Sequence, residues 1–113
     1  MNLTTSHAGA VAILKINEPR LTFPLLPDFA ETGERLIGDG HPRLLVDLSS
    51  VTYLDSATIG CLMDLYRQAT AAGGTLKVSG AQKRVETMLT MTGAHNFLEL
   101  HADQASALAS FGG

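Results

Sequence analysis

The sequence predicts an α/β fold in which a mixed β-sheet, opened by an N-terminal hairpin and continued by parallel strands, is covered by about four helices. Three observations support this prediction. Two strand-like segments near the start are separated by a glycine turn, which is typical of a hairpin. Segments with strand and helix patterns then alternate along the chain. Their brief connections indicate right-handed crossovers between parallel strands.

The N-terminal segment provides the hairpin and the first helix. The expected strands are residues 3–5 and 11–16, with a tight turn between them at residues 8–10. Pro24 and Pro27 are expected to prevent regular structure until a helix begins near Asp28, because proline is tolerated only in a first helical turn. Gly38 and Gly40 are expected to end this helix. Its apolar residues recur at helical spacing: Leu26, Phe29, Ala30, Gly33, Leu36 and Ile37.

The rest of the chain alternates strand and helix. Residues 44–48 are predicted as a buried central strand, 75–79 as a half-buried strand and 96–100 as a short edge segment. Helices are predicted from residue 56 to the glycines at 73–74, from about 81 to Gly93, and over 103–111. The helix that begins at residue 56 has one apolar stripe, formed by Ile59, Leu62, Met63, Tyr66 and Ala69.

The amino-acid composition argues against some classes of function. A chain of 113 residues that is 45% hydrophobic fits one domain, residues 1–113, whose core needs no metal or disulfide. The 8 Lys and Arg are outnumbered by 11 Asp and Glu and are scattered, which argues against direct nucleic-acid binding and favours protein partners. The four histidines lack metal-ligand spacing, so no metal site is predicted.

Cellular location is inferred from cysteine usage and hydropathy. The single cysteine, Cys61, excludes an intramolecular disulfide and suits a reducing compartment, which predicts a cytoplasmic protein. No apolar run approaches the roughly 20 residues of a membrane-spanning helix. The N-terminal residues also lack a signal-peptide pattern, so neither membrane insertion nor export is expected.

Ser56 is the residue with the most informative position. It stands with Asp55 at the expected start of a helix, next to the carboxyl end of a strand, where functional groups gather in parallel sheets. Three roles are open: helix capping, which the pattern alone favours, a phosphorylated switch, and a nucleophile. The third is disfavoured, because no Gly-x-Ser-x-Gly elbow surrounds Ser56 and no histidine is placed as a base. No catalytic residue is therefore assigned.

The segment around Ser56 resembles a known family. The strand at residues 44–48, the Asp-Leu-Ser-Ser-Val-Thr-Tyr-Leu-Asp-Ser sequence at 47–56, Gly60, and Ala-Ala-Gly-Gly-Thr-Leu-Lys-Val at 71–78 are similar to STAS domains, specifically to bacterial anti-sigma factor antagonists. The resemblance is closest from about residue 44 to residue 100. It implies a STAS-like mixed sheet.

The resemblance also implies a partner-switching protein in transcription regulation. Such a protein binds an anti-sigma factor that is also a serine kinase, is released when phosphorylated, and is restored by a phosphatase. By position, Ser56 would be the acceptor and Asp55 its acidic neighbour. Any ATP and magnesium would belong to the kinase, so no cofactor is expected on this chain.

Two departures from the family pattern concern residues beside the acceptor. Ala57-Thr58 follows Ser56 where relatives often have Ser or Thr and then Gly, which leaves Thr58 as a second, less favoured hydroxyl. Thr22 stands near the place where relatives often carry an acidic residue close to the kinase nucleotide. Thr58, Cys61 and Leu65 are further expected to form an apolar docking face beside Ser56.

Alternative functions remain open at this point. The same helix could pack constitutively on a transporter ATPase or within a stress-sensing assembly, as other STAS proteins do, with no phosphorylation. An enzyme with Ser56 or Cys61 as nucleophile is the weakest option. The helix dipole could lower the pKa of the Cys61 thiol, although an ordinary packed residue is favoured there.

Overall fold

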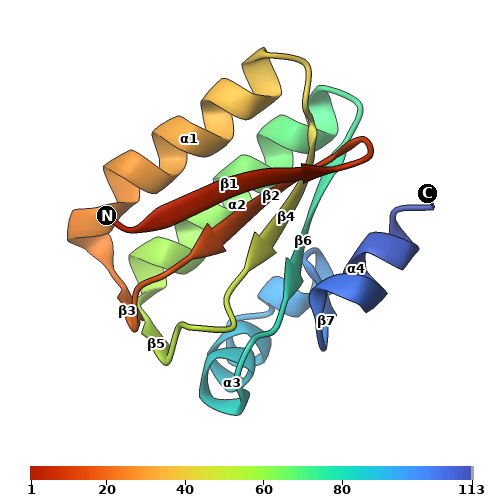
Figure 1. Ribbon diagram of the computed structural model, residues 1–113. Coiled ribbons are helices and arrows are strands. Elements are labelled where there is room, and N and C mark those ends of the chain that lie inside the picture. The colour runs from red at the N-terminus through yellow and green to blue at the C-terminus, as the bar shows by residue number, and fades with distance from the viewer. Residues whose placement is uncertain (113) are drawn as a thin grey trace.

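A five-stranded mixed sheet forms the centre of the structure, a computed structural model that describes residues 1–112 (Figure 1). Its strands are β1 (Leu3–Ala8), β2 (Val11–Ile16), β4 (Arg43–Asp47), β6 (Thr75–Ser79) and β7 (Glu99–His101). They lie in the order β1-β2-β4-β6-β7. β1 is antiparallel to β2, and the other neighbouring pairs are parallel. The predicted hairpin and parallel strands are confirmed.

Four α-helices within the described residues cover the sheet, as predicted. They are α1 (Leu26–Gly38), α2 (Ser56–Ala71), α3 (Lys83–Met91) and α4 (Gln104–Ser110). α1 and α2 lie side by side over one face, and α4 packs on the opposite face (Figure 1). Successive side chains of a strand point to opposite faces of the sheet, so each strand contributes apolar residues to both. In β2, Leu14 packs on the α1 and α2 side, whereas Ile13 packs on the α4 side.

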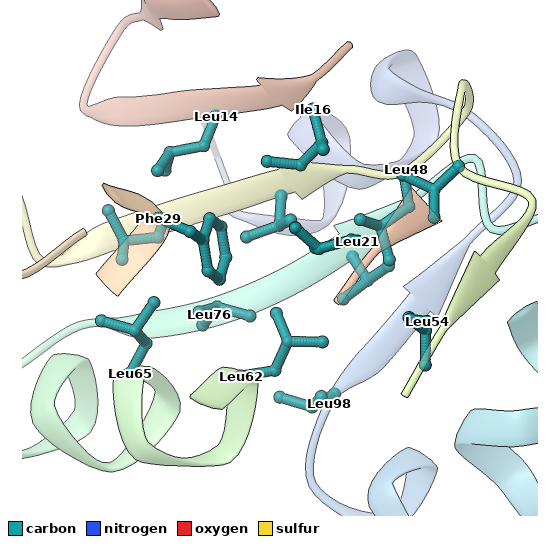
Figure 2. Close-up of a cluster of buried hydrophobic side chains, with 14 of the residues drawn as sticks. Leu14, Ile16, Leu21, Phe29, Leu48, Leu54, Leu62, Leu65, Leu76 and Leu98 are labelled. Carbon is teal, nitrogen blue, oxygen red and sulfur yellow. The ribbon is translucent and has the colours of Figure 1, made fainter. Parts of the chain in front are cut away.

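The larger core lies between the sheet and helices α1 and α2. Phe29 of α1 and Leu62 and Leu65 of α2 belong to one buried cluster with strand residues such as Leu14 and Leu76 (Figure 2). The close approach of the two helices depends on Gly33 of α1. A Cβ atom there would lie 2.9 Å from both Cδ atoms of Leu65. Leu65 is therefore part of the helix–helix contact.

The apolar stripe predicted for α2 is confirmed but incomplete. Ile59, Leu62 and Ala69 are buried, and Met63 and Tyr66 are half-buried and pack against the core. The prediction left out Thr58 and Leu65, which are also buried. Helix α1 accounts for the difference, because it covers the Leu65 side of α2, which a helical wheel of α2 by itself treats as the margin.

A second, two-stranded parallel sheet was not predicted. It is formed by β3 (Arg20–Leu21) and β5 (Tyr53–Leu54), and the 3-10 turn η1 (Phe23–Leu25) follows β3. The expectation that prolines prevent regular structure before α1 is thus wrong. Pro24 is accommodated at the start of η1, where its missing amide donor is not needed. The pairing of β3 with β5 places the segment before α1 beside the segment before α2.

Other element boundaries also differ, and the first strand, predicted over residues 3–5, extends to Ala8. Only residues 99–100 of the predicted edge segment at 96–100 lie in a strand, β7, which pairs parallel with β6. Asn96 ends the 3-10 turn η2 (Ala94–Asn96), and residues 97–98 connect the two. The predicted central strand at residues 44–48 begins and ends one residue earlier. Within residues 1–112, no helix is both long enough and apolar enough to cross a membrane.

Candidate functional site at the start of helix α2

Asp55 caps helix α2. Its backbone is extended, with φ −99° and ψ 176°, and its Oδ1 atom accepts a hydrogen bond from the Thr58 amide at 2.9 Å. This bond satisfies one of the amides that a helix start leaves without a partner. The prediction that Ser56 caps the helix is wrong, because Ser56 is already the first helical residue and Asp55 occupies the capping position.

Ser56 is exposed at the first turn of α2. Among residues 1–112, its hydroxyl makes no hydrogen bond to another protein group. The oxygen therefore faces solvent in the positive field of a helix amino terminus. A group transferred to this oxygen would leave the Asp55 cap in place.

Thr58 has the opposite environment. Its side chain is fully buried, and its Oγ1 atom lies 2.7 Å from the Leu21 carbonyl oxygen and 2.7 Å from Asp55 Oδ1. A hydroxyl held in this way is inaccessible to another protein unless the helix start opens. The expectations that Thr58 offers a second modifiable hydroxyl and lines a docking face are therefore wrong.

The segment before α1 is fastened to this helix start. The Phe23 amide donates to Asp55 Oδ2 at 3.0 Å, and Leu21 accepts from Thr58. Thr22 lies between these two anchored residues and is half-buried, so the structure brings it to the start of α2. Phe23 itself is 69% exposed, and sequence periodicity gave no sign of it because it stands outside the helical pattern.

The charge of Asp55 is stabilised by this arrangement. Partial burial acts to raise the pKa of its carboxyl group. Hydrogen bonds from the Thr58 hydroxyl and amide and from the Phe23 amide outweigh burial, so the pKa is lowered overall. Asp55 is thus an ionised cap that joins two segments, and its lone pairs are largely used within the molecule.

A groove of about 420 Å³ runs between α1 and α2. Phe23 stands at one end, and small residues of α2 (Ala57, Gly60 and Cys61) form part of its wall. Charged or polar side chains border it: Glu34, Asp64, Arg67 and Gln68. The groove therefore offers an apolar floor with a polar rim, one turn from Ser56.

Two expectations about the docking face beside Ser56 are wrong: the exposure of Leu65 and the lowered pKa of Cys61. Leu65 lines the groove but is only 1% exposed, so it supports the groove from the core and does not form an exposed face. Cys61 is half-buried, and burial, together with the charges of Asp64 and Glu34, raises its pKa to about 11. The lowered pKa considered for Cys61 is wrong, and its thiol stays protonated near neutral pH.

Metal-binding geometry is absent from the described part of the chain. No group of three or more His, Cys, Asp or Glu side chains in residues 1–112 is arranged to hold a metal ion. The chemistry available at the start of α2 is that of an exposed hydroxyl beside an ionised carboxylate.

Comparison with known proteins identifies sequence relatives of this chain. Residues 3–100 match the protein-family model described as Mlab, STAS domain. A Thermotoga neapolitana protein, named as a homologue of the anti-sigma factor antagonist TM1081, is 23% identical over 75 residues. That match spans 66% of this chain and 66% of the relative.

Solved structures share the fold at low identity. The Thermotoga maritima protein TM1081, named as an anti-sigma factor antagonist, gives a TM-score of 0.89 at 18% identity over 96% of this chain and 93% of its own. The Bacillus protein SpoIIAA in its phosphorylated form gives 0.75 at 11% identity over 96% and 98%. A sulfate transporter family protein from Wolinella succinogenes gives 0.77 at 21% identity over 89% and 84%.

Proposed function

The chain belongs to the STAS domain family, and we propose that it is an anti-sigma factor antagonist that changes partners when Ser56 is phosphorylated. Unphosphorylated, it would bind an anti-sigma factor that is also a serine kinase. Phosphorylation would release it, and a phosphatase would restore binding. In this proposal the chain acts in the cytoplasm as one regulatory domain, and the kinase and phosphatase supply the catalysis.

One observation carries the proposal: the Ser56 hydroxyl is exposed and free while Asp55 caps the helix. A phosphate on Ser56 would gain from the positive end of the α2 dipole, so the fold would tolerate it. The same phosphate would add nearly two negative charges beside Asp55. A partner docked there would meet repulsion and a desolvation penalty.

The groove between α1 and α2 extends the proposed docking surface away from Ser56. Exposed Phe23 offers an aromatic anchor, and the small side chains Ala57 and Gly60 allow close approach. Thr22 lies on the anchored segment that carries Phe23, and Cys61 lines the same groove. Asp55, Ser56, Thr22 and Cys61 remain in the proposed partner surface, whereas Thr58 and Leu65 support it from below.

Phosphate transfer is the direct test. The protein would be incubated with ATP, magnesium and an anti-sigma factor kinase from the same host, and its intact mass would be measured. We expect one phosphate on the wild type and on Ser50→Ala, which removes another exposed serine, and none on Ser56→Ala. Phosphate on Ser56→Ala, or its absence from the wild type under an active kinase, would refute Ser56 as the acceptor.

A second candidate is supported by the Wolinella structure, which is named as a sulfate transporter family protein. In that case, the same surface would pack constitutively on a transporter or stress-sensing complex. Copurification from the native host separates the two candidates. A transporter subunit would stay bound to the same assembly before and after phosphatase treatment, and it would carry no phosphate.

A further inference from the structure

Two arginines and a tyrosine from three separate elements meet close to the start of α2. The guanidinium carbon of Arg20 in β3 lies 4.4 Å from the centroid of the Tyr53 ring in β5. The guanidinium carbon of Arg84 in α3 lies 5.3 Å from the same centroid. The two cations are therefore within about 10 Å of each other. We call Arg20, Tyr53 and Arg84 the arginine cluster.

The charge of the arginine cluster is unpaired within the described residues 1–112. In residues 1–112, no carboxylate lies within salt-bridge distance of Arg20 or Arg84, whereas Arg67 and Lys77 each have an acidic partner. The nearby Asp55 carboxylate already accepts bonds from Thr58 and Phe23. At about 0.1 M salt the screening length is about 10 Å, so the two guanidinium groups still repel each other.

Packing against Tyr53 leaves the guanidinium N–H donors of Arg20 and Arg84 able to bind a carboxylate. A guanidinium that stacks on an aromatic ring uses its face, while its N–H donors project in the plane of the group. Arg20 and Arg84 are both exposed, and Tyr53 is half-buried. Stacking also limits the conformations of two long side chains, so less entropy is lost when a carboxylate binds.

The geometry points to a docking site for an acidic segment of a protein partner, in which two carboxylates pair with Arg20 and Arg84. Alternate residues of an extended segment lie about 7 Å apart on one side, which suits two cations within 10 Å. Binding would also relieve the repulsion between the guanidinium groups. Tyr53 is three residues before Ser56, hence at most about 11 Å away between Cα atoms, so this site adjoins the proposed switch.

Binding of an acidic segment at the arginine cluster does not require phosphate on Ser56, so it can be tested on the unphosphorylated protein. A hexaglutamate peptide would be titrated into ¹⁵N-labelled protein at low salt, and amide shifts would be followed by NMR. We expect saturable shifts centred on Arg20, Tyr53 and Arg84. Arg20→Gln and Arg84→Gln should each raise Kd about two- to fivefold, the scale of an exposed charge pair.

Control variants distinguish specific binding at the arginine cluster from non-specific electrostatic attraction of the acidic peptide. Lys83→Gln and Arg67→Gln remove the same charge elsewhere and should leave Kd within error of the wild type, and Tyr53→Phe should also bind normally. The spectrum of each variant reports whether it is folded. Equal weakening by Arg67→Gln, shifts that do not saturate, or tighter binding of inorganic phosphate at the same amides would overturn the inference. A failed kinase assay would leave it standing.

Discussion

Asp55 and Phe23, 32 residues apart, are joined by a 3.0 Å hydrogen bond from the Phe23 amide to Asp55 Oδ2. The same carboxylate caps α2 through Thr58. One side chain therefore fixes the helix start and the loop that carries an exposed aromatic ring beside it. The proposed partner surface depends on this connection.

Asp55 and Ser56 should respond differently to truncation. Asp55→Ala removes the helix cap and the bond to Phe23, and we expect a loss of about 1–2 kcal/mol in the free energy of unfolding. Ser56→Ala should change that free energy by less than about 0.5 kcal/mol, because an exposed side chain with no internal partner is removed. Urea unfolding at pH 7 measures both. A larger loss for Ser56→Ala would mean that Ser56 is the cap.

The contribution of Asp55 should depend on pH. Its folded-state pKa is lowered, so its stabilising effect is present above the unfolded pKa, about 3.9, and is lost as pH falls through the folded pKa. Asp55→Asn keeps an acceptor oxygen but does not titrate. The difference in unfolding free energy between the wild type and Asp55→Asn should therefore shrink from pH 6 to pH 3. A difference that stays constant over this range would contradict the cause assigned here.

Leu65 should behave as a core residue. Its side chain is 1% exposed against Gly33 of the neighbouring helix, so Leu65→Ala is expected to cost about 2–5 kcal/mol. Met91, which is 82% exposed, provides the matched control, and Met91→Ala should cost less than about 0.5 kcal/mol. Denaturant unfolding of both variants is the measurement. If Leu65→Ala lost as little unfolding free energy as Met91→Ala, Leu65 would not be a core residue.

The two glycines after α2 should differ in their tolerance of alanine. Gly73 has φ +90° and open space around it, so Gly73→Ala is expected to cost about 1 kcal/mol through backbone strain. A Cβ atom on Gly74 would lie 2.1 Å from the Pro42 carbonyl oxygen, and backbone would have to move. Gly74→Ala should thus be clearly more destabilising. Thermal unfolding of the two variants compares them, and an equal shift would contradict the steric argument.

Local sequence patterns predicted most of the fold. The hairpin, the parallel strands and the four helices follow from alternation, helical spacing and glycine stops. Each of these patterns is formed by residues that are close together in the sequence. The small β3 and β5 sheet was missed because strands of two residues carry no alternation. Its pairing is decided by contacts between segments more than 30 residues apart.

The candidate site was predicted less completely, for the same reason. Ser56 and Asp55 could be placed at a helix start from sequence, but which of them caps depends on the backbone conformation at one residue. The burial of Thr58 and Leu65 is imposed by Leu21 and Gly33, which come from other parts of the chain. Phe23 and the arginine cluster likewise appear only when distant segments are brought together.

The most direct test of the central claim is the affinity of stoichiometrically phosphorylated protein for the proposed anti-sigma factor kinase, compared with that of unphosphorylated protein by calorimetry. We expect phosphate on Ser56 to weaken binding at least about tenfold, or about 1.4 kcal/mol. Ser56→Ala should bind like the unphosphorylated wild type. Equal affinities of the phosphorylated and unphosphorylated forms, with the fold intact in both, would contradict the proposed switch.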